Sequence, residues 1–418
     1  MVDIERADLV VVGGGTVGGW AGWFAKSAGL DRVVILERGL VGQGASSRAA
    51  GIVRAQGGTP TTVALGRWSI DFYNRQAAEI GTDSGFRELG YLILAVTAED
   101  ERAARERVAM QQGQGLAVRW LSAAEAAAAI PTLASTGHRG GTYLETDGHI
   151  DPPRNVRAYS LAMQRAGVEL RERTAFTGLR VESLPGGGGG GRVVGVETSA
   201  GPIATERVIL TGGPGLREVG ALAGMRIPAG AVRHTVAVLE PDPAFAVDRQ
   251  PMVFDIGAGL YWRLEEGGLL FGWSDPNDRP GEARTIDWPM YDEMRARLAG
   301  FVPVTAGLDL RKIWAATIDF TPDHLPILGP GLTAAGKRIE GVTVASAGGH
   351  GMMWGPAVAR VAADLAVLGR TDLVDVTDLG LDRFDGEGRS RLASDPIALP
   401  FPVSADDPPT ARPTEAVD

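Results

Sequence analysis

A glycine-rich turn near the start of the chain constrains its fold more than any other feature. The residues Gly13-Gly14-Gly15-Thr16-Val17-Gly18 have the spacing G-x-G-x-x-G. They follow the apolar run 9–12 and precede an Ala-, Trp- and Phe-rich stretch that extends to about Ala28, and a second apolar run, 33–36, ends at Glu37. This succession of strand, glycine turn, helix and strand predicts a βαβ unit of the Rossmann type.

The parts of this unit have separate tasks in binding a dinucleotide. Gly13 permits the tight turn, Gly15 lets the backbone approach the pyrophosphate, and Gly18 lets the helix pack closely on the strand. The positive end of the helix faces the phosphate charge, and Glu37 accepts hydrogen bonds from the adenosine ribose. The motif alone does not separate FAD from NAD. The residues expected to bind the dinucleotide here are Gly13, Gly15, Thr16, Val17, Gly18, Glu37 and Arg38.

Five further segments are spread over nearly the whole chain. They are 44–51 (GASSRAAG), 147–152 (DGHIDP), 208–213 (VILTGG), 321–329 (TPDHLPILG) and 348–351 (GGHG). Together with the first turn they resemble the D-amino-acid oxidase superfamily of flavoproteins, the group of glycine oxidase, sarcosine oxidase and dimethylglycine dehydrogenase. The resemblance implies that the cofactor is FAD. It adds as cofactor-binding residues Ser46, Ser47, Arg48, Gly212, Gly213, Gly349, His350, Gly351 and Met352.

The attachment of the flavin follows from the same resemblance. In the sarcosine and dimethylglycine branches the flavin is often bound covalently to a cysteine or a histidine, and in the dimethylglycine branch this histidine precedes Ala-Ala-Gly. Arg48 stands at that position here, the chain has no cysteine, and its five histidines lie far from that position in the sequence. We therefore expect FAD to be bound non-covalently. Arg48 then supplies a positive charge near the flavin, although a phosphate contact or a surface ion pair would explain it equally. The Ser46-Ser47 pair is equally compatible with a turn or a helix cap.

Two residues are candidates for catalysis. His234 and Tyr261 occur in segments that look like the dimethylglycine dehydrogenase pattern, where a histidine and a tyrosine face the substrate over the flavin. Hydride leaves the carbon next to an amine only when the nitrogen has lost its proton, and a histidine can favour or accept that proton. Both residues also have an ordinary interpretation, as a hydrogen-bonded sheet histidine and a strand aromatic.

Four residues are candidates for binding the substrate. Arg54 matches the sarcosine oxidase stretch after its glycine-serine motif, and Arg263 is a second arginine suited to a carboxylate. Sarcosine oxidase uses a lysine just after its Gly-His-Gly, whereas methionines follow here. Met353 and Trp354 therefore suggest a more apolar pocket, or simply core packing. We expect His324 to be structural or to contact the flavin.

The chain divides into two interleaved domains, because 418 residues exceed what one core normally supports. We expect a discontinuous FAD-binding domain, formed by 1–85, 150–228 and 318–390. The inserts 86–149 and 229–317 should form a substrate-binding domain with an antiparallel sheet above the flavin. The glycine run 186–191 predicts a flexible surface loop. The proline-rich tail 394–418 is expected to be disordered.

Composition restricts the partners. The formal net charge of −10 gives no broad positive field for nucleic acid. The absence of cysteine excludes disulfides and thiolate metal sites, and the scattered histidines show no metal-binding spacing. The apolar stretches 9–25 and 341–359 are interrupted by glycines and do not predict membrane spans, and the acidic start does not predict a signal peptide. We expect a cytoplasmic protein acting on small molecules.

The sequence thus predicts an α/β flavoprotein that oxidises a C–N bond of a secondary or tertiary amine or amino acid to an imine, which water then hydrolyses. The reduced flavin passes its electrons to oxygen or to a carrier. One alternative is a D-amino-acid dehydrogenase that reduces a quinone or carrier. Another is a non-catalytic flavin-binding subunit of an oxidase complex, and an NAD-dependent dehydrogenase is the least favoured. The oligomeric state does not follow from the sequence.

Overall fold

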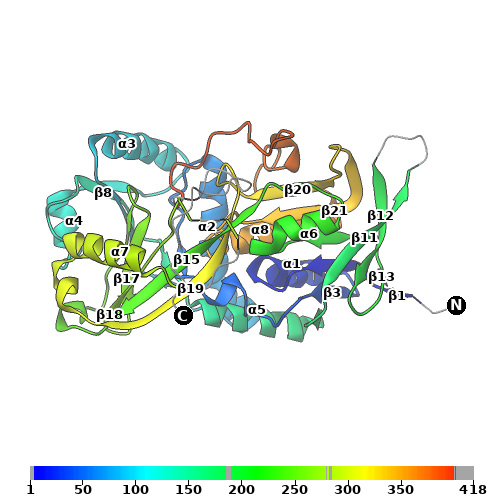
Figure 1. Ribbon diagram of the computed structural model, residues 1–418, viewed down its shortest axis with the longest axis horizontal. Helices are drawn as coiled ribbons and strands as arrows, with labels where there is room; N and C mark the ends of the chain where they lie inside the picture. Colours follow the sequence, from blue (N-terminus) through cyan, green and yellow to red (C-terminus); the bar gives the residue numbers. More distant parts are fainter. Residues whose placement is uncertain (1–3, 185–189, 279, 282–284, 400, 402–418) are drawn as a thin grey trace.

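Two large sheets lie beside each other along the long axis of the molecule (Figure 1). The computed structural model describes residues 4–184, 190–278, 280–281, 285–399 and 401. Within this part of the chain one sheet has ten strands, one has eight, and a small sheet has three. The small sheet consists of β4 (Ile52–Val53), β9 (Gly148–His149) and β5 (Arg87–Glu88). Helices and sheets alternate as the predicted mixed α/β class requires.

The ten-stranded sheet contains the predicted βαβ unit. Its strands, in spatial order, are β1 (Glu5–Arg6), β13 (Ile203–Ala204), β12 (Gly191–Thr198), β21 (Arg338–Ser346), β14 (Val208–Leu210), β2 (Leu9–Val12), β3 (Val33–Leu36) and β10 (Glu169–Arg171), while β11 (Phe176–Ser183) pairs with β12 and β20 (Ile327–Leu332) pairs with β21. The central strands β21, β14, β2, β3 and β10 are all parallel. The two strands of the predicted unit, β2 and β3, have the predicted bounds, because an unbroken apolar run suits a parallel strand buried on both faces.

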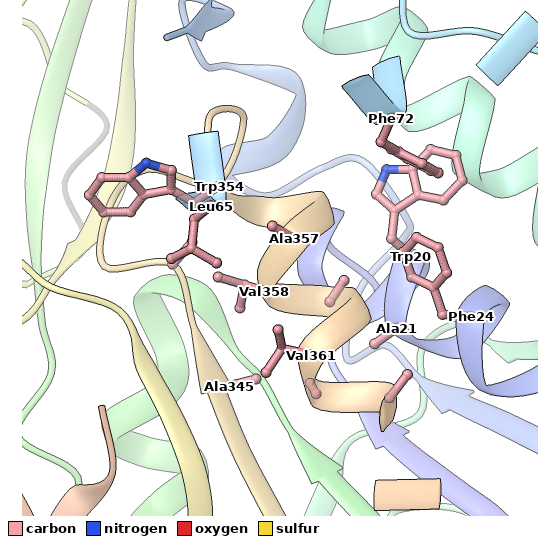
Figure 2. Packing of buried hydrophobic residues seen from close by; sticks show 14 of the residues in the cluster. Trp20, Ala21, Phe24, Leu65, Phe72, Ala345, Trp354, Ala357, Val358 and Val361 are labelled. Atoms are coloured by element: carbon pink, nitrogen blue, oxygen red, sulfur yellow. The ribbon is translucent and has the colours of Figure 1, made fainter. Parts of the chain in front are cut away.

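Helices cover one face of this sheet and enclose the larger core. They are α1 (Thr16–Ser27), α2 (Pro60–Ile80), α5 (Pro152–Ala166) and α8 (Gly355–Leu368), while the short α6 (Leu216–Leu222) packs on the opposite face. Figure 2 shows α8 passing through this core, with Ala357, Val358 and Val361 between Leu65 on one side and Trp20 and Phe24 on the other. Alanines on α8 let it approach α1 closely. This packing fixes where α1 begins, and with it the glycine turn.

Helix α5 also positions the glycine turn. Asp151 caps its first turn by accepting a hydrogen bond from the backbone N–H of Arg154 at 3.0 Å. From this helix the Asn155 amide donates to Thr16 Oγ1 at 3.1 Å, and the Tyr159 hydroxyl donates to the carbonyl of Gly14 at 3.2 Å. A helix more than 130 residues away in the sequence therefore holds the turn in place.

The eight-stranded sheet forms the other half of the molecule. Its strands, in spatial order, are β19 (Leu310–Phe320), β15 (Gly230–Leu239), β18 (Gly268–Trp273), β17 (Leu260–Glu265), β16 (Met252–Asp255), β6 (Tyr91–Ala95), β8 (Gly140–Leu144) and β7 (Arg119–Ser122). All neighbours are antiparallel except β16 and β6, which are parallel because the chain leaves β6 and returns to its side much later. Around this half lie α3 (Ala98–Gly113), α4 (Ala123–Ala129) and α7 (Trp288–Phe301).

The end of the described chain differs from the sequence expectation. The prediction of disorder from residue 394 does not hold for 394–399 and 401, where Asp395, Ile397 and Phe401 are buried. These side chains find apolar and hydrogen-bonding partners that composition alone does not reveal. The rest of that tail lies outside the described residues, as do 185–189 of the predicted glycine loop. No helix in the described part of the chain has the length and hydrophobicity needed to cross a bilayer.

Candidate functional site

The glycine turn has the geometry that a bound pyrophosphate requires. Gly13 has φ +100°, a conformation that favours glycine. A Cβ on Gly18 would lie 1.9 Å from the carbonyl oxygen of Gly13, so only glycine lets α1 start this close to the strand. A Cβ on Gly15 would contact only Ser46 Oγ, at 3.3 Å. The backbone at the start of α1 is therefore open to a ligand.

Ser46 and Glu37 complete the turn. Ser46, in the short 3-10 helix 45–47, accepts hydrogen bonds from the backbone N–H and the hydroxyl of Thr16 at 3.0 and 3.1 Å. Glu37, directly after β3, accepts from the backbone N–H groups of Gly14 and Gly39 at 2.9 and 2.8 Å. Its carboxylate is thereby fixed where an adenosine ribose would donate to it.

Two later glycine corners meet the first turn. Gly212 and Gly213 follow β14 with φ +155° and +48°, and Gly348 and Gly349 follow β21 with φ +54° and +87°. Because β21, β14 and β2 are parallel neighbours, the carboxyl ends of these strands meet at one edge of the sheet. The corners converge there although they are about 200 and 335 residues apart from the first turn in the sequence.

A single cavity extends from this edge to the eight-stranded sheet. Most of the residues predicted from the sequence line it. From the cofactor set these are Gly13, Gly15, Thr16, Val17, Gly18, Glu37, Arg38, Ser46, Arg48, Gly212, Gly213, Gly349, His350, Gly351 and Met352. From the catalytic and substrate sets they are His234, Tyr261, Arg54 and Met353. The site is therefore built from both halves of the molecule.

Three predicted residues do not line the cavity. The Ser47 hydroxyl donates to the carbonyl of Gly42. The Arg263 guanidinium donates to the carbonyls of Ala50 and Leu264 and pairs with Glu265, and these contacts hold it outside the cavity lining.

Trp354 is the third of these residues. It lies in the apolar core beside Leu65 (Figure 2), with its ring 4.1 Å from that of His350. Its place at the amino-terminal cap of α8 directs the indole into the core.

The cavity fits a flavin nucleotide on the evidence of its own walls. Glycines of all three corners line it, and a Cβ at Gly44 or Gly351 would meet nothing within 4 Å. An anion is favoured at the start of α1, an acid stands ready for a ribose, and apolar side chains such as Phe254 and Ile52 line the far end. The glycine turn and the corners would hold the dinucleotide, and the far end would hold its ring.

His234 and Tyr261 form a hydrogen-bonded pair at that far end. Tyr261, on β17, bonds to Nε2 of His234, on β15, and Nδ1 of His234 bonds to the Ser274 hydroxyl at 2.8 Å. Burial lowers the pKa of His234 to about 4 and raises the pKa of Tyr261. The histidine is therefore neutral at pH 7 and accepts from the tyrosine O–H, while its Nδ1–H donates to Ser274.

Arg54 supplies the buried positive charge of this end. Its guanidinium is 3% exposed and donates to the carbonyls of Gln56 and Ile397. Asp147 lies nearby, accepts from the backbone N–H of Ala55 at 2.6 Å, and has a pKa that burial raises to about 7. Burial thus weakens the negative charge of Asp147, and the Arg54 cation favours a carboxylate in the cavity over an ammonium.

Sequence reasoning missed several lining residues. Asp319 at the end of β19 accepts from the Ser346 hydroxyl at 2.9 Å, and burial raises its pKa. Ile397 and Leu399 line the cavity from the segment expected to be disordered. No local spacing in the sequence links these residues to the site. The pairing of β15 with β19 brings Asp319 there, and the path of the terminal segment brings Ile397 and Leu399. Among the described residues no group of three or more metal-ligating side chains occurs.

Comparison with known proteins gives a consistent result. A model of the FAD dependent oxidoreductase (DAO) family matches residues 8–365. The 4-methylaminobutanoate oxidase (formaldehyde-forming) of Paenarthrobacter nicotinovorans is 30% identical over 395 residues, which cover 91% of this chain and 46% of that protein. The glycine oxidase of Geobacillus kaustophilus is 29% identical, with coverage of 92% and 98%. Its crystal structure superposes with a TM-score of 0.77 over 91% of this chain and 100% of that one, at 26% identity.

The lengths of these relatives differ. The chain spans only 36% to 46% of the first four curated relatives it matches, including the methylaminobutanoate oxidase. It spans nearly the whole of the glycine oxidase. The similarity therefore covers the part of the longer relatives that corresponds to the fold described above.

Proposed function

The chain belongs to the FAD-dependent oxidoreductase (DAO) family, whose cofactor is FAD, and on that premise we propose that it oxidises the C–N bond of a secondary or tertiary amine or amino acid that carries a carboxylate. The observation that supports this most strongly is the meeting of Arg54 and the His234–Tyr261 pair in the cavity of the glycine turns. The names of two relatives support the substrate class, since both 4-methylaminobutanoate and glycine combine an amine with a carboxylate.

Arg54 is the proposed carboxylate ligand. Two of its N–H groups are used by backbone carbonyls, which hold the guanidinium in one orientation while other N–H groups remain for a substrate. A guanidinium so fixed can bind a carboxylate in a planar, bidentate manner. The amine of the same molecule would then lie toward Tyr261 and His234.

The site favours the neutral form of the amine. An alkylammonium has a pKa of ~10, so most of such a substrate is protonated in water at neutral pH. Near Arg54 and the neutral His234 the ammonium is disfavoured, so the amine binds in its neutral form and its proton goes to water. The Tyr261 hydroxyl, held by His234 Nε2, can orient the neutral amine. The neutral nitrogen then supplies the lone pair that forms the C=N bond as hydride leaves the adjacent carbon.

Bound FAD supplies the hydride acceptor, and its electrons go on to oxygen or to a carrier. Water adds to the released imine and yields an amine and a carbonyl compound. We propose that FAD is held non-covalently. Arg48 lies on the cavity wall at the position that corresponds to a flavin-linking histidine, and no cysteine exists in the chain.

Anaerobic mixing of the FAD-loaded protein with a panel of amines tests the proposal. The panel should contain glycine, sarcosine, dimethylglycine, 4-methylaminobutanoate, proline and D-alanine. We expect the visible flavin absorption to bleach with at least one N-alkyl member, and bleaching by D-alanine alone would indicate an enzyme specific for D-amino acids. Unchanged absorption with every amine would contradict the proposal and favour a non-catalytic flavin-binding subunit. Peroxide formed on admitting air distinguishes an oxidase from a dehydrogenase.

A further inference from the structure

The last described segment of the chain forms one wall of the cavity at the substrate end. We name residues 395–399 and Phe401 the C-terminal wall. Ile397 and Leu399 line the cavity, and Ile397 is 1% exposed. Ile397 belongs to the same apolar cluster as Tyr261 and Phe254, and it lines the same cavity as the proposed catalytic pair. The wall therefore faces the place where the substrate's amine and its substituents would react.

Hydrogen bonds fasten this wall at its beginning. The backbone N–H of Asp395 donates to the carbonyl of Asp323 at 2.9 Å, and the Asp395 carboxylate accepts from the N–H of Ile397 at 2.8 Å. Asp323 is itself anchored by a buried ion pair with Arg383. The carbonyl of Ile397 then accepts from Arg54 Nη2 at 2.6 Å. One residue thus contributes both an apolar side chain and a backbone contact to the proposed carboxylate ligand.

Aromatic packing fastens the far end of the wall. The ring of Phe401 stacks on that of Phe320, with centroids 5.6 Å apart and planes 16° apart. It also meets the His324 ring edge-on at 5.4 Å. This gives His324 a structural role consistent with its absence from the cavity lining. The wall is held at both ends, and the side chains between them have little freedom to move aside.

We propose that Ile397 and Leu399 determine which substituent on the reacting amine is accepted, and that they restrict it to a small apolar group. This deepens the proposed function and rests on it. A β-branched isoleucine is stiff at χ1, so a bulky substituent cannot be accommodated by simple rotation. An apolar wall beside Tyr261 offers no partner to a polar or charged substituent, which would lose its hydration without compensation.

Substrates of increasing size test this proposal. The FAD-loaded protein and its variants Ile397→Ala and Leu399→Ala would be assayed with N-methyl-, N-butyl- and N-benzylglycine. We expect each variant to raise the ratio of kcat/KM for the benzyl over the methyl compound by about tenfold or more, the effect of a few carbons in an apolar pocket. Because the Ile397 carbonyl remains, binding of the carboxylate by Arg54 should be kept.

A matched control separates selectivity from stability. Ile339, 3% exposed in the core on the other face of the ten-stranded sheet, loses the same atoms in Ile339→Ala without touching the cavity. In Ile339→Ala the ratio of kcat/KM for the benzyl over the methyl compound should equal that of the unmodified protein. Equal ratios in all variants, or an equal change in Ile339→Ala, would overturn the proposal. If Ile397→Ala does not fold, Ile397→Val gives a smaller change in the same direction.

Failure of the proposed function gives a different result. If no amine bleaches the flavin of the unmodified protein, the amine chemistry is wrong, but the wall is still measurable by ligand binding. Acetate, butanoate and benzoate would then be titrated while the flavin spectrum is followed. A preference for benzoate over acetate that rises about tenfold in Ile397→Ala supports the wall. An unchanged preference overturns it.

Discussion

The hydrogen bond between Tyr261 and His234 carries the most specific prediction. In Tyr261→Phe the ring stays in its strand, but the hydroxyl is lost and His234 Nε2 remains buried without a partner. Leaving a buried acceptor unpaired costs about 1–3 kcal/mol, and loss of a hydroxyl that orients the reacting amine costs about 100-fold in rate. We expect kcat/KM for an N-methyl amino acid to fall about 100-fold, which corresponds to about 2.7 kcal/mol of transition-state stabilisation.

The assay is steady-state turnover together with anaerobic flavin reduction by the best substrate. If the two residues act as a unit, the double variant with His234→Gln should be about as slow as the slower single variant. The matched control is Tyr291→Phe, since Tyr291 is a buried tyrosine of the same half that accepts from Arg295 at 2.9 Å and does not line the cavity. It should keep its kcat/KM. Activity within twofold of the unmodified protein in Tyr261→Phe would refute the role of the Tyr261 hydroxyl.

Three further predictions concern the cofactor and the response to acid. Two carboxylate oxygens of Glu37 accept hydrogen bonds from the N–H groups of Gly14 and Gly39, and Glu37→Gln replaces one of these oxygens with an NH₂ donor. We therefore expect the Kd of FAD to rise about tenfold, as measured by fluorescence titration of the apoprotein. With Arg48 in place of a linking histidine, acid precipitation should release all flavin into the supernatant, and a yellow pellet would show covalent attachment. Burial lowers the pKa of His149 from 6.5 to about 3, so the unfolded state binds the extra proton and this residue removes stability as the pH falls below 6.5. The unfolding free energy should therefore fall less between pH 6.5 and 5 in His149→Gln than in the unmodified protein, by about 2 kcal/mol. Urea titration at both pH values measures this difference. An identical fall in both proteins would show that His149 is protonated in the folded state.

The local part of this structure was predictable from the sequence. The runs 9–12 and 33–36 form strands with those bounds. A short, continuous apolar run is typical of a parallel strand that is buried on both faces. The family match confirms the family resemblance and FAD as the family's cofactor, and the structure confirms the α/β class. Glycine corners with positive φ were recognisable because few other residues tolerate that conformation.

The distal parts of the site depended on tertiary structure. Tyr261 and Arg263 share a face of β17 by alternation, yet only the first reaches the cavity, since Ala50 and Glu265 bind the second. Composition suggested disorder for the segment that holds Ile397, because proline and acidic residues are typical of unfolded tails. Its burial depends on partners such as Arg54, which is 343 residues away. No property of a short window encodes such a contact.

The central claim is that the three glycine corners enclose one FAD. The most direct measurement is the native mass of the purified protein, followed by identification of the nucleotide that acid releases. We expect the mass to exceed that of the chain by a single FAD, and we expect this increment to be lost together with the yellow colour. A bound NAD, or a protein that takes up no flavin even after reconstitution with FAD, would contradict it.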